Sequence, residues 1–389
     1  MATLGSVCRF LNGGTPSKAV QSYFEGDIPW ITSADISGPI ANYARSFITE
    51  DAVRNSAVNK VAAGSVLLVT RTGVGKVAIA EKELCFSQDI TALIPDKSKL
   101  DAGYLVHFLQ TKKPHFLSLA RGATIQGITR NVVSDLSIPL LPLAEQRRIA
   151  AILDQADALR AKRRKVLAQL DSLTQSIFIE MFGNPVQNER GWEIKRLEHA
   201  VEGKYGVKAG PFGSSLKKED YSESGYRVYG QEQVIAGTFI IGNYYISASK
   251  FEQLKSCAVS EGDLLVSLVG SFGKVLIVPP GIEPVIINPR LLKITPRKAL
   301  LESLFLAHLI GSKAIQDKLI SVSHGGTMGI LNAGLLKDLE VILPPVSEQR
   351  SFARRIEAVR EIQATNFSAL DELNKLFASL QHRAFQGEL

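Results

Sequence analysis

The sequence predicts an α+β protein that contains one unit twice, each copy a β-rich globular part followed by a long helix. Two recurring stretches predict this. The stretch "GSVLLVTRTGVGKV" from Gly64 returns as "GDLLVSLVGSFGKV" from Gly262, and "DLSIPLLPLAEQR" from Asp135 returns as "DLEVILPPVSEQR" from Asp338. A period of about half the chain is far longer than a solenoid repeat, so we expect a duplicated domain.

The elements of each globular part follow from local patterns. We expect short strands at Val66–Val69 and Leu264–Leu268, because each is an apolar run that ends at a glycine turn. Helix pairs are expected over Leu100–Leu119 and Leu300–Ile320, with breaks near Pro114 and Gly311. The last strand of each part is expected at Val132–Leu141 and Leu339–Leu343, just before the prolines.

The segments after the prolines show a heptad pattern instead. In the first, the positions three and four apart are Ile149, Ile152, Ala156, Leu159, Arg163, Val166, Leu170, Leu173 and Ile177. In the second they are Ile356, Val359, Gln363, Asn366, Leu370, Leu373, Phe377, Leu380 and Ala384. One such pattern also fits a surface helix, but two of matching length, each closing a repeat, favour helices that pair with each other.

Composition places the chain in a broad class. Its 389 residues suit two or three domains of roughly 150 residues, and its net charge of +7 suits an anionic partner such as nucleic acid. Cys8, Cys85 and Cys257 are scattered and fit neither a disulfide framework nor a metal site. The N-terminus lacks a signal-peptide pattern and no run of about 18 apolar residues exists, so we expect a cytoplasmic protein.

Catalytic motifs are missing. The glycine turns before Lys76 and Lys274 resemble a phosphate-binding loop, but Thr70 and Leu268 stand where that loop needs a glycine. A glycine hairpin alone, and a hairpin whose Lys76, Lys274 and Arg71 contact DNA phosphates, remain equally open. The sequence contains no "DPPY" or "NPPF" stretch and no histidine spacing typical of zinc sites. We therefore expect no catalytic residue, no metal and no cofactor on this chain.

Polar residues after short strands and in glycine-rich loops are the candidate DNA contacts. Glutamine can bond adenine and aspartate can accept from cytosine, although ordinary turn chemistry is the favoured explanation for any single one of them. The candidates are Thr32, Ser33, Asp35, Arg71, Lys76, Arg121, Gln126, Arg130, Lys217, Gln231, Gln233, Lys274, Arg290, His324 and Thr327. The basic stretch "LRAKRRKVL" around Arg163 is either a solvated helix face or a contact to DNA or a partner.

A set of motifs in a fixed order resembles the DNA-specificity subunit of type I restriction–modification systems. The motifs are "GDIPWITSADISG" from Gly26, "GKVAI" from Gly75, "PLLPLAEQRRIAAIL" from Pro139, "SIFIEMFGNP" from Ser176, "LPPVSEQR" from Leu343 and "LQHRAFQGEL" from Leu380. The resemblance covers essentially the whole chain. One departure is that the first domain starts abruptly at Leu4, without the lead-in "GWEIKRLEHAV" of the second.

The resemblance implies a domain plan and a function. Residues 1–142 and 185–343 would be target-recognition domains, and residues 143–184 and 344–389 would be spacer helices that pair antiparallel. Each domain would read one half of a split site in double-stranded DNA, while the helices would set the spacing and dock two modification (methyltransferase) subunits. Restriction (motor–nuclease) subunits would join them. S-adenosylmethionine, ATP and magnesium would bind the partners, whose complex would methylate adenine and cut DNA with ATP.

Two other classes remain open from the residues themselves. The chain could be an enzyme acting alone, against which the missing motifs count, or a coiled-coil adaptor between proteins whose basic charge is incidental.

Overall fold

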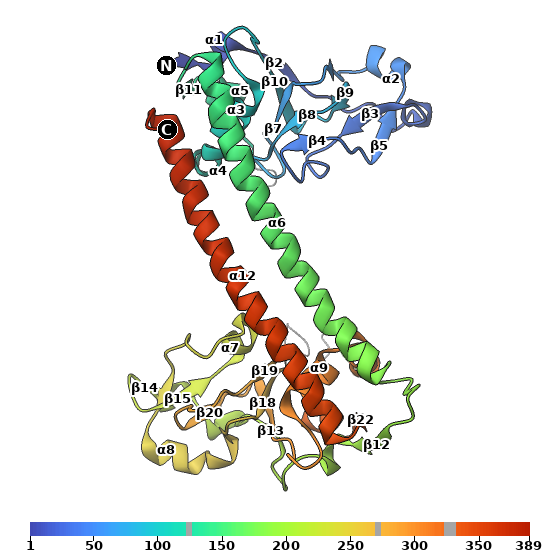
Figure 1. Cartoon of the computed structure of the whole chain (residues 1–389), viewed down its shortest axis with the longest axis vertical. Helices are drawn as coiled ribbons and strands as arrows, with labels where there is room; N and C mark the ends of the chain where they lie inside the picture. The colour runs from blue at the N-terminus through green and yellow to red at the C-terminus, as the bar shows by residue number, and fades with distance from the viewer. Residues whose placement is uncertain (122–126, 269–273, 323–331) are drawn as a thin grey trace. The chain divides into compact units, whose positions relative to one another are not determined.

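The computed structural model describes residues 1–121, 127–268, 274–322 and 332–389. The chain folds into two compact units. The first contains Met1–Lys165 and Phe367–Leu389, and the second contains Val166–Asn366. Each unit therefore combines one globular part with segments of both long helices, which are green and red in Figure 1.

The first unit contains two sheets whose side chains pack together in one buried hydrophobic cluster. The larger sheet has the order β2-β10-β7-β8-β4, and the other has the order β5-β3-β9-β6. Their strands are β2 (Cys8–Asn12), β10 (Ile90–Pro95), β7 (Val66–Val69), β8 (Val77–Ala80), β4 (Ile40–Ala41), β5 (Ser46–Ile48), β3 (Ile28–Ile31), β9 (Leu84–Phe86) and β6 (Lys60–Val61). All four residues of β7 are buried. Val66 and Leu68 enter one hydrophobic cluster, whereas Leu67 and Val69 enter another. This alternation explains the continuous apolar run in the sequence.

The second unit repeats the topology of four strands in each sheet, but it has no counterpart of β4 and carries an additional edge strand, β14. Its sheets have the orders β13-β21-β18-β19 and β14-β16-β15-β20-β17. Their strands are β13 (Val207–Ala209), β21 (Leu291–Ile294), β18 (Leu264–Ser267), β19 (Val275–Ile277), β14 (Tyr221–Ser222), β16 (Tyr245–Ile246), β15 (Tyr226–Tyr229), β20 (Val285–Ile287) and β17 (Ala258–Val259). β15 runs parallel to β20, as β3 runs parallel to β9. The duplicated α+β fold is thus confirmed, and it extends into the regions where the sequence match is weak.

Short helices and edge strands complete the two units. The short helices are α1 (Leu4–Val7), α2 (Glu50–Arg54), α5 (Arg130–Ser134), α7 (Gln231–Ala236), α8 (Ala248–Gln253) and α11 (Ala333–Lys337), with 3-10 turns at Gln21–Phe24, Leu197–His199, Gly213–Ser215, Lys218–Asp220 and Lys255–Cys257. The two-stranded pairs are β1 (Ala2–Thr3) with β11 (Ser137–Ile138) and β12 (Glu193–Arg196) with β22 (Glu340–Leu343).

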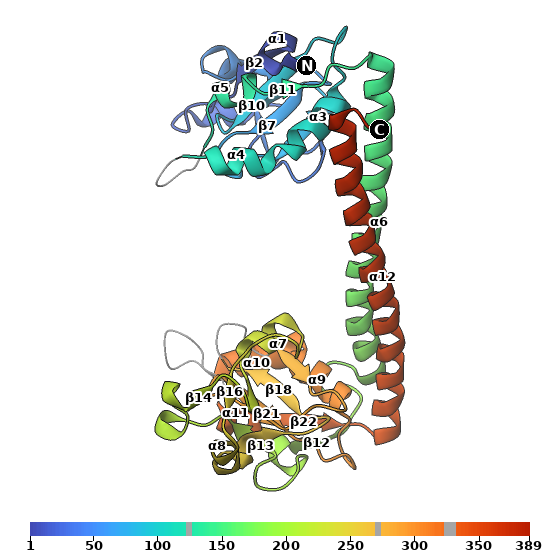
Figure 2. The same ribbon diagram turned by 90° about the vertical axis from the view of Figure 1, so that its left-hand side faces the viewer.

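In each unit a pair of helices packs on one of the sheets: the sheet that contains β7 and β8 in the first unit, and the sheet that contains β18 and β19 in the second. In the first unit α3 (Ala102–Thr111) and α4 (Lys113–Leu119) break at Lys112, and Pro114 lies in the first turn of α4. Figure 2 shows both beside β7. In the second unit α9 (Ser303–Gly311) and α10 (Lys313–Val322) break at Ser312.

One predicted strand is partly wrong. The segment 132–141 contains the end of α5 before the two residues of β11. A helical turn in this segment buries Val133 completely and packs it near α1. Tertiary packing overrides strand propensity here.

The long helices are α6 (Leu143–Phe182) and α12 (Val346–Gln386). In the first unit the beginning of α6 lies against the end of α12, where Arg160 Nε donates to Asn374 Oδ1 at 2.8 Å. In the second unit the end of α6 lies against the beginning of α12, where Gln363 Nε2 donates to Asp171 Oδ1 at 2.7 Å. The helices are therefore antiparallel within each unit.

The buried face of α12 follows the heptad positions named above. Ile356, Val359 and Phe377 are buried, and Leu370, Leu373 and Leu380 are half-buried.

The buried face of α6 differs from the predicted one at three positions. Ile149 is buried, and Ile152, Ala156, Leu170 and Ile177 are half-buried. The prediction was wrong for three residues that the structure exposes: Leu159, Val166 and Leu173. Buried Leu153 and Leu167, and half-buried Arg160 and Thr174, occupy the seam instead. Arg163, which the predicted pattern also includes, is half-buried. Apolar spacing favoured Leu159 and Leu173 over their polar neighbours Arg160 and Thr174.

Candidate nucleic-acid interface

The hairpin between β7 and β8 places the first candidate lysine. Gly73 and Gly75 have φ values of 109° and 88°, which glycine adopts without strain. A Cβ on Gly75 would stand 2.8 Å from Lys113 Cγ, so the turn also needs a residue without a side chain. The hairpin leaves Lys76 exposed, and its Nζ donates to the Ser33 carbonyl at 3.0 Å. The hairpin thus contacts the polar segment that follows β3.

That segment is a turn closed by Asp35. The Thr32 N–H and hydroxyl donate to Asp35 Oδ2 at 2.8 and 2.7 Å, and Arg45 Nε donates to Asp35 Oδ1 at 2.6 Å. Burial alone would raise the pKa of Asp35, but these hydrogen bonds outweigh it and hold the pKa below its usual value. The Asp35 side chain is only 3% exposed. Asp35 and the buried Ser33 therefore shape the turn, and this geometry gives no support to a base contact from the Asp35 carboxylate.

Two further arginines of the first unit come together through the backbone. Gly127 forms antiparallel bridges with both Arg71 and Arg121. The Ile128 N–H also donates to the Thr70 carbonyl at 3.0 Å, so this strand-like segment lies beside the β7–β8 hairpin. Arg71 and Arg121 are exposed. Together with Lys76 they form a basic edge suited to DNA phosphates.

Arg130 lies elsewhere, since its guanidinium stands over the Phe10 ring at 5.2 Å from the ring centroid. Gln126, His324 and Thr327 lie outside the described residues.

The second unit repeats the lysine contact. Lys274 precedes β19 as Lys76 precedes β8, and its Nζ lies 3.5 Å from the Ile235 carbonyl in α7. Lys274, Lys217 and Arg290 are all exposed. The Arg290 carbonyl accepts from the Leu268 N–H at 3.1 Å, which places Arg290 at the end of β18.

The two candidate glutamines of α7 differ in accessibility. Gln231 is half-buried, whereas Gln233 is 0% exposed. The Gln233 side chain accepts from the Gly230 N–H and donates to the Ile241 carbonyl, both at 2.7 Å. A base contact by Gln233 is therefore contradicted, because its amide is already used inside the protein. Its spacing after a strand could not reveal this.

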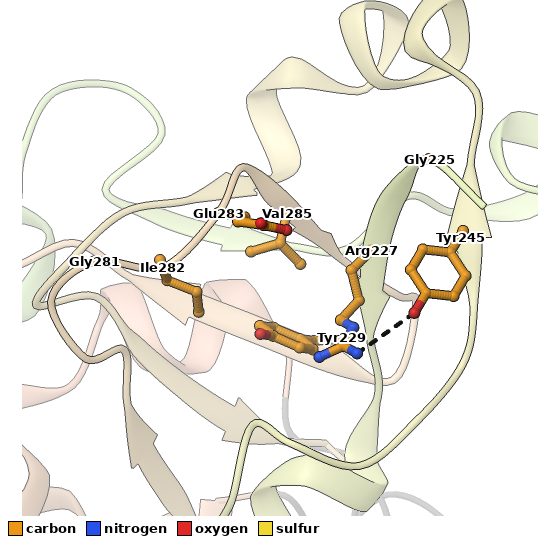
Figure 3. Close-up of a pocket in the computed structure, with 8 residues that line it drawn as sticks. All are labelled: Gly225, Arg227, Tyr229, Tyr245, Gly281, Ile282, Glu283 and Val285. Atoms are coloured by element: carbon orange, nitrogen blue, oxygen red, sulfur yellow. Dashed lines mark hydrogen bonds between the residues drawn. The ribbon is translucent and has the colours of Figure 1, made fainter.

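A pocket of about 320 Å³ lies on the second sheet of the second unit. Its lining residues are Gly225, Arg227, Tyr229, Tyr245, Gly281, Ile282, Glu283 and Val285. Figure 3 shows Arg227 directed toward Tyr245, and its guanidinium donates to the Tyr245 hydroxyl at 3.4 Å and to the Phe239 carbonyl at 3.2 Å. Burial raises the pKa of Tyr229, which also lines the pocket. Sequence reasoning missed Arg227, because nothing local marks a strand arginine as a loop anchor.

The repeated "EQR" motif has a structural role in both units. Gln146 Oε1 accepts from the Asp101 N–H at 2.9 Å, while its Nε2 donates to the Lys99 and Leu141 carbonyls at 2.8 and 2.7 Å.

Gln349 makes the same three bonds in the second unit. Its Oε1 accepts from the Glu302 N–H at 2.9 Å, and its Nε2 donates to the Leu300 and Pro344 carbonyls at 2.9 and 2.8 Å. Each glutamine thus fixes the start of a long helix to the N-terminus of α3 or α9. The recurrence of the motif was the signal available in the sequence.

Within the described ranges, no group of three or more His, Cys, Asp or Glu residues is arranged to hold a metal ion. Among the helices in those ranges, none combines the length and apolar character needed to cross a membrane.

Comparison with known proteins places these features in a family. Residues 1–170 and 191–375 match the family model described as type I restriction modification DNA specificity domain. The chain is 24% identical over 405 residues to the type I restriction enzyme MjaIX specificity subunit of Methanocaldococcus jannaschii, covering 97% of this chain and 90% of that protein. It is 32% identical over 164 residues to the EcoR124I/EcoR124II specificity subunit of Escherichia coli, covering 40% of each.

Solved structures share the fold. The S subunit of a type I restriction–modification system from M. genitalium aligns with a TM-score of 0.58 at 16% identity, covering 98% of this chain and 95% of that one. A chain from a study of complex assembly and conformational transition in the type I system aligns with a TM-score of 0.61 at 18% identity, covering 100% and 97%.

Proposed function

This chain belongs to the type I restriction modification DNA specificity family, and from that premise we propose that it is the sequence-specific DNA-binding subunit of a type I restriction–modification complex. Each globular part would read one half of a bipartite site. The observation that supports this most directly is the duplicated geometry. In each unit the lysine before an equivalent strand, Lys76 or Lys274, contacts a backbone carbonyl downstream of another equivalent strand: Ser33 after β3, and Ile235 in α7 after β15.

The basic residues supply the sequence-independent part of binding. Arg71, Lys76 and Arg121 in the first unit, and Lys217, Lys274 and Arg290 in the second, are exposed cations. Cations of this kind neutralise phosphates and position a reader on the duplex, while neighbouring loops read the bases. The binding should therefore weaken steeply with salt.

The paired helices would set the spacing between half-sites and dock two modification subunits. The equivalent hydrogen bonds of Gln146 and Gln349 support this, because they join each globular part to a long helix in the same way. Two similar docking surfaces would suit two identical partners. Restriction subunits would join that complex, and S-adenosylmethionine, ATP and magnesium would bind the partners. The chain by itself would neither methylate nor cut DNA.

A domain exchange tests the assignment of one reader to each half-site. Residues 1–141 are replaced by the equivalent domain of a relative, and the chain is co-expressed with its modification subunits. Single-molecule sequencing of the host genome should show a new first half of the methylated motif and an unchanged second half. Simultaneous change of both halves would contradict the proposal, as would sequence-specific methylation by the chain without partners.

A further inference from the structure

The loop between α7 and β16, residues 238–244, exposes large apolar side chains in the second unit. Ile240 is 85% exposed and Tyr244 is 56% exposed. Neighbouring Ile235 and Ile241 are also exposed. Single exposed apolar residues are ordinary, but a group of them on one loop marks a surface that binds something.

The loop is nevertheless held firmly. The Arg227 guanidinium donates to the Phe239 carbonyl, the buried Gln233 amide donates to the Ile241 carbonyl, and the Val228 N–H donates to the Tyr244 carbonyl at 2.8 Å. The Phe239 ring packs on Tyr229 with centroids 5.0 Å apart. A loop fixed at both ends and at its middle loses little conformational entropy when it binds.

A cation lies beside the loop. Lys274 Nζ is within 3.5 Å of the Ile235 carbonyl, at the end of the helix that leads into the loop. The surface therefore combines an exposed positive charge with protruding apolar side chains. This combination complements a DNA groove, where phosphates line the edges and thymine methyl groups are the apolar feature.

The first unit has the same arrangement with different residues. The segment between β3 and β5 exposes Ile40 at 53% and Tyr43 at 65%. Arg45 anchors this segment to Asp35, and Lys76 lies against the same turn. Equivalent loops thus each expose an isoleucine and a tyrosine beside a lysine, on stretches of different sequence.

We propose that loop 238–244 reads a base pair in the half-site of the second unit, and that Ile240 contacts the C5 methyl group of a thymine in the major groove. This inference rests on the proposed function. Ile240 has no side-chain hydrogen-bonding group, so it cannot recognise a base through a donor or an acceptor. Of the groups that base edges present in the major groove, the thymine methyl is the one that an aliphatic side chain selects.

The proposal is tested with the complex of this chain and its modification subunits, whose affinity is measured for DNA duplexes of defined sequence. Each thymine of the second half-site is replaced singly by deoxyuridine, which lacks only the methyl group. For the wild-type complex, one replacement should weaken binding about fivefold, an effect of the size expected for a base-edge contact. Ile240→Ala should weaken binding to the thymine duplex by a similar factor and remove the difference between thymine and deoxyuridine.

Ile194→Ala is the matched control, since Ile194 is 49% exposed on β12 of the same unit. It should leave both affinities unchanged. Thermal melting of both variants checks that they fold. The inference is overturned if no deoxyuridine replacement affects the wild type, if the ratio persists in Ile240→Ala, or if that variant weakens binding equally on all sequences. A wild-type complex that does not distinguish motif DNA from scrambled DNA would refute the proposed function itself.

Discussion

Gln146 and Gln349 occupy equivalent places in the two units, and each side-chain amide makes the same set of three hydrogen bonds. Both residues are fully buried. A buried amide is costly unless every polar atom finds a partner, and here the partners are backbone groups of two segments: the one that leads into α3 or α9, and the one that leads into the long helix. The side chain of one residue therefore determines how a long helix meets its globular part.

Replacing either glutamine should destabilise the unit that contains it. Gln146→Ala leaves one backbone N–H and two carbonyls without their partner, so we expect the free energy of unfolding to fall by about 2–4 kcal/mol. Gln349→Ala should behave alike. Chemical denaturation of the purified chain measures the free energy of unfolding. As a control, Gln155→Ala on the exposed face of α6 should change the free energy of unfolding by less than about 0.5 kcal/mol. Equal, small effects of all three variants would contradict the role of the amides.

The Asp35 turn should make stability depend on pH. The pKa of Asp35 lies below its usual value of 3.8, because hydrogen bonds from Thr32 and Arg45 outweigh the effect of burial. The ionised carboxylate therefore stabilises the fold above about pH 4, and this contribution is lost as pH falls further. Asp35→Asn should lower the melting temperature at pH 7 and differ little from wild type near pH 2. Glu25→Gln, at an exposed carboxylate, should show no such pH-dependent difference.

At the scale of the element, the two long helices combine an apolar seam with a polar hydrogen bond in each unit. Arg160 lies over the Phe377 ring at 4.2 Å from the centroid and also donates to Asp157 and Asn374. Burial lowers the pKa of its guanidinium, and the nearby Asp157 carboxylate partly offsets this. Gln363 plays the equivalent part with Asp171. Polar pairs of this kind fix the register of two helices, because a shifted register would leave them unpartnered.

The observed seam can be tested with two leucines of α6. Leu153 is fully buried, whereas Leu159 is 53% exposed. Leu153→Ala should lower the free energy of unfolding by about 2–5 kcal/mol, because it removes buried methyl groups and leaves a cavity. Leu159→Ala should change it by less than about 0.5 kcal/mol. Denaturation of the isolated chain separates the two. The reverse ranking would restore the heptad positions predicted from the sequence.

At the scale of the whole molecule, the same fold occurs twice with different surface loops. The two units share the lysine before β8 or β19, the buried glutamine at the start of the long helix (Gln146 or Gln349) and the order of four strands in each sheet. The loops that expose Ile40 and Tyr43 or Ile240 and Tyr244 differ in sequence. A shared frame with separate loops suits two readers that are joined to the partners equivalently but recognise different half-sites.

Lengthening both helices should change the spacing of the methylated motif. We would add one heptad to α6 between Arg160 and Asp171, and one to α12 between Gln363 and Asn374, which keeps both seams in phase. Each helix grows by roughly 10 Å at 1.5 Å per residue, or about three base pairs of B-DNA. Those base pairs also rotate the far half-site by about 100°, which DNA twisting or bending must absorb.

We therefore expect either a longer gap with unchanged half-sites or sharply weakened binding, read from the methylated motif by single-molecule sequencing. An unaltered spacing at full activity, with the longer helices shown to be folded, would mean that the helices do not set the spacing.

The sequence alone determined the duplication, the α+β class, the two long helices and the family resemblance, because repeated motifs and periodic apolar residues are local properties of the chain. Tertiary structure decided what depends on neighbours distant in sequence. It placed Arg160 rather than Leu159 in the seam, since an arginine can be buried once Asp157, Asn374 and Phe377 surround it. The tertiary structure also decided that the Gln233 amide is buried and donates to the Ile241 carbonyl, whereas the Ile240 side chain is exposed. The reason is that the fold determines which hydrogen-bond partners lie within reach of each side chain.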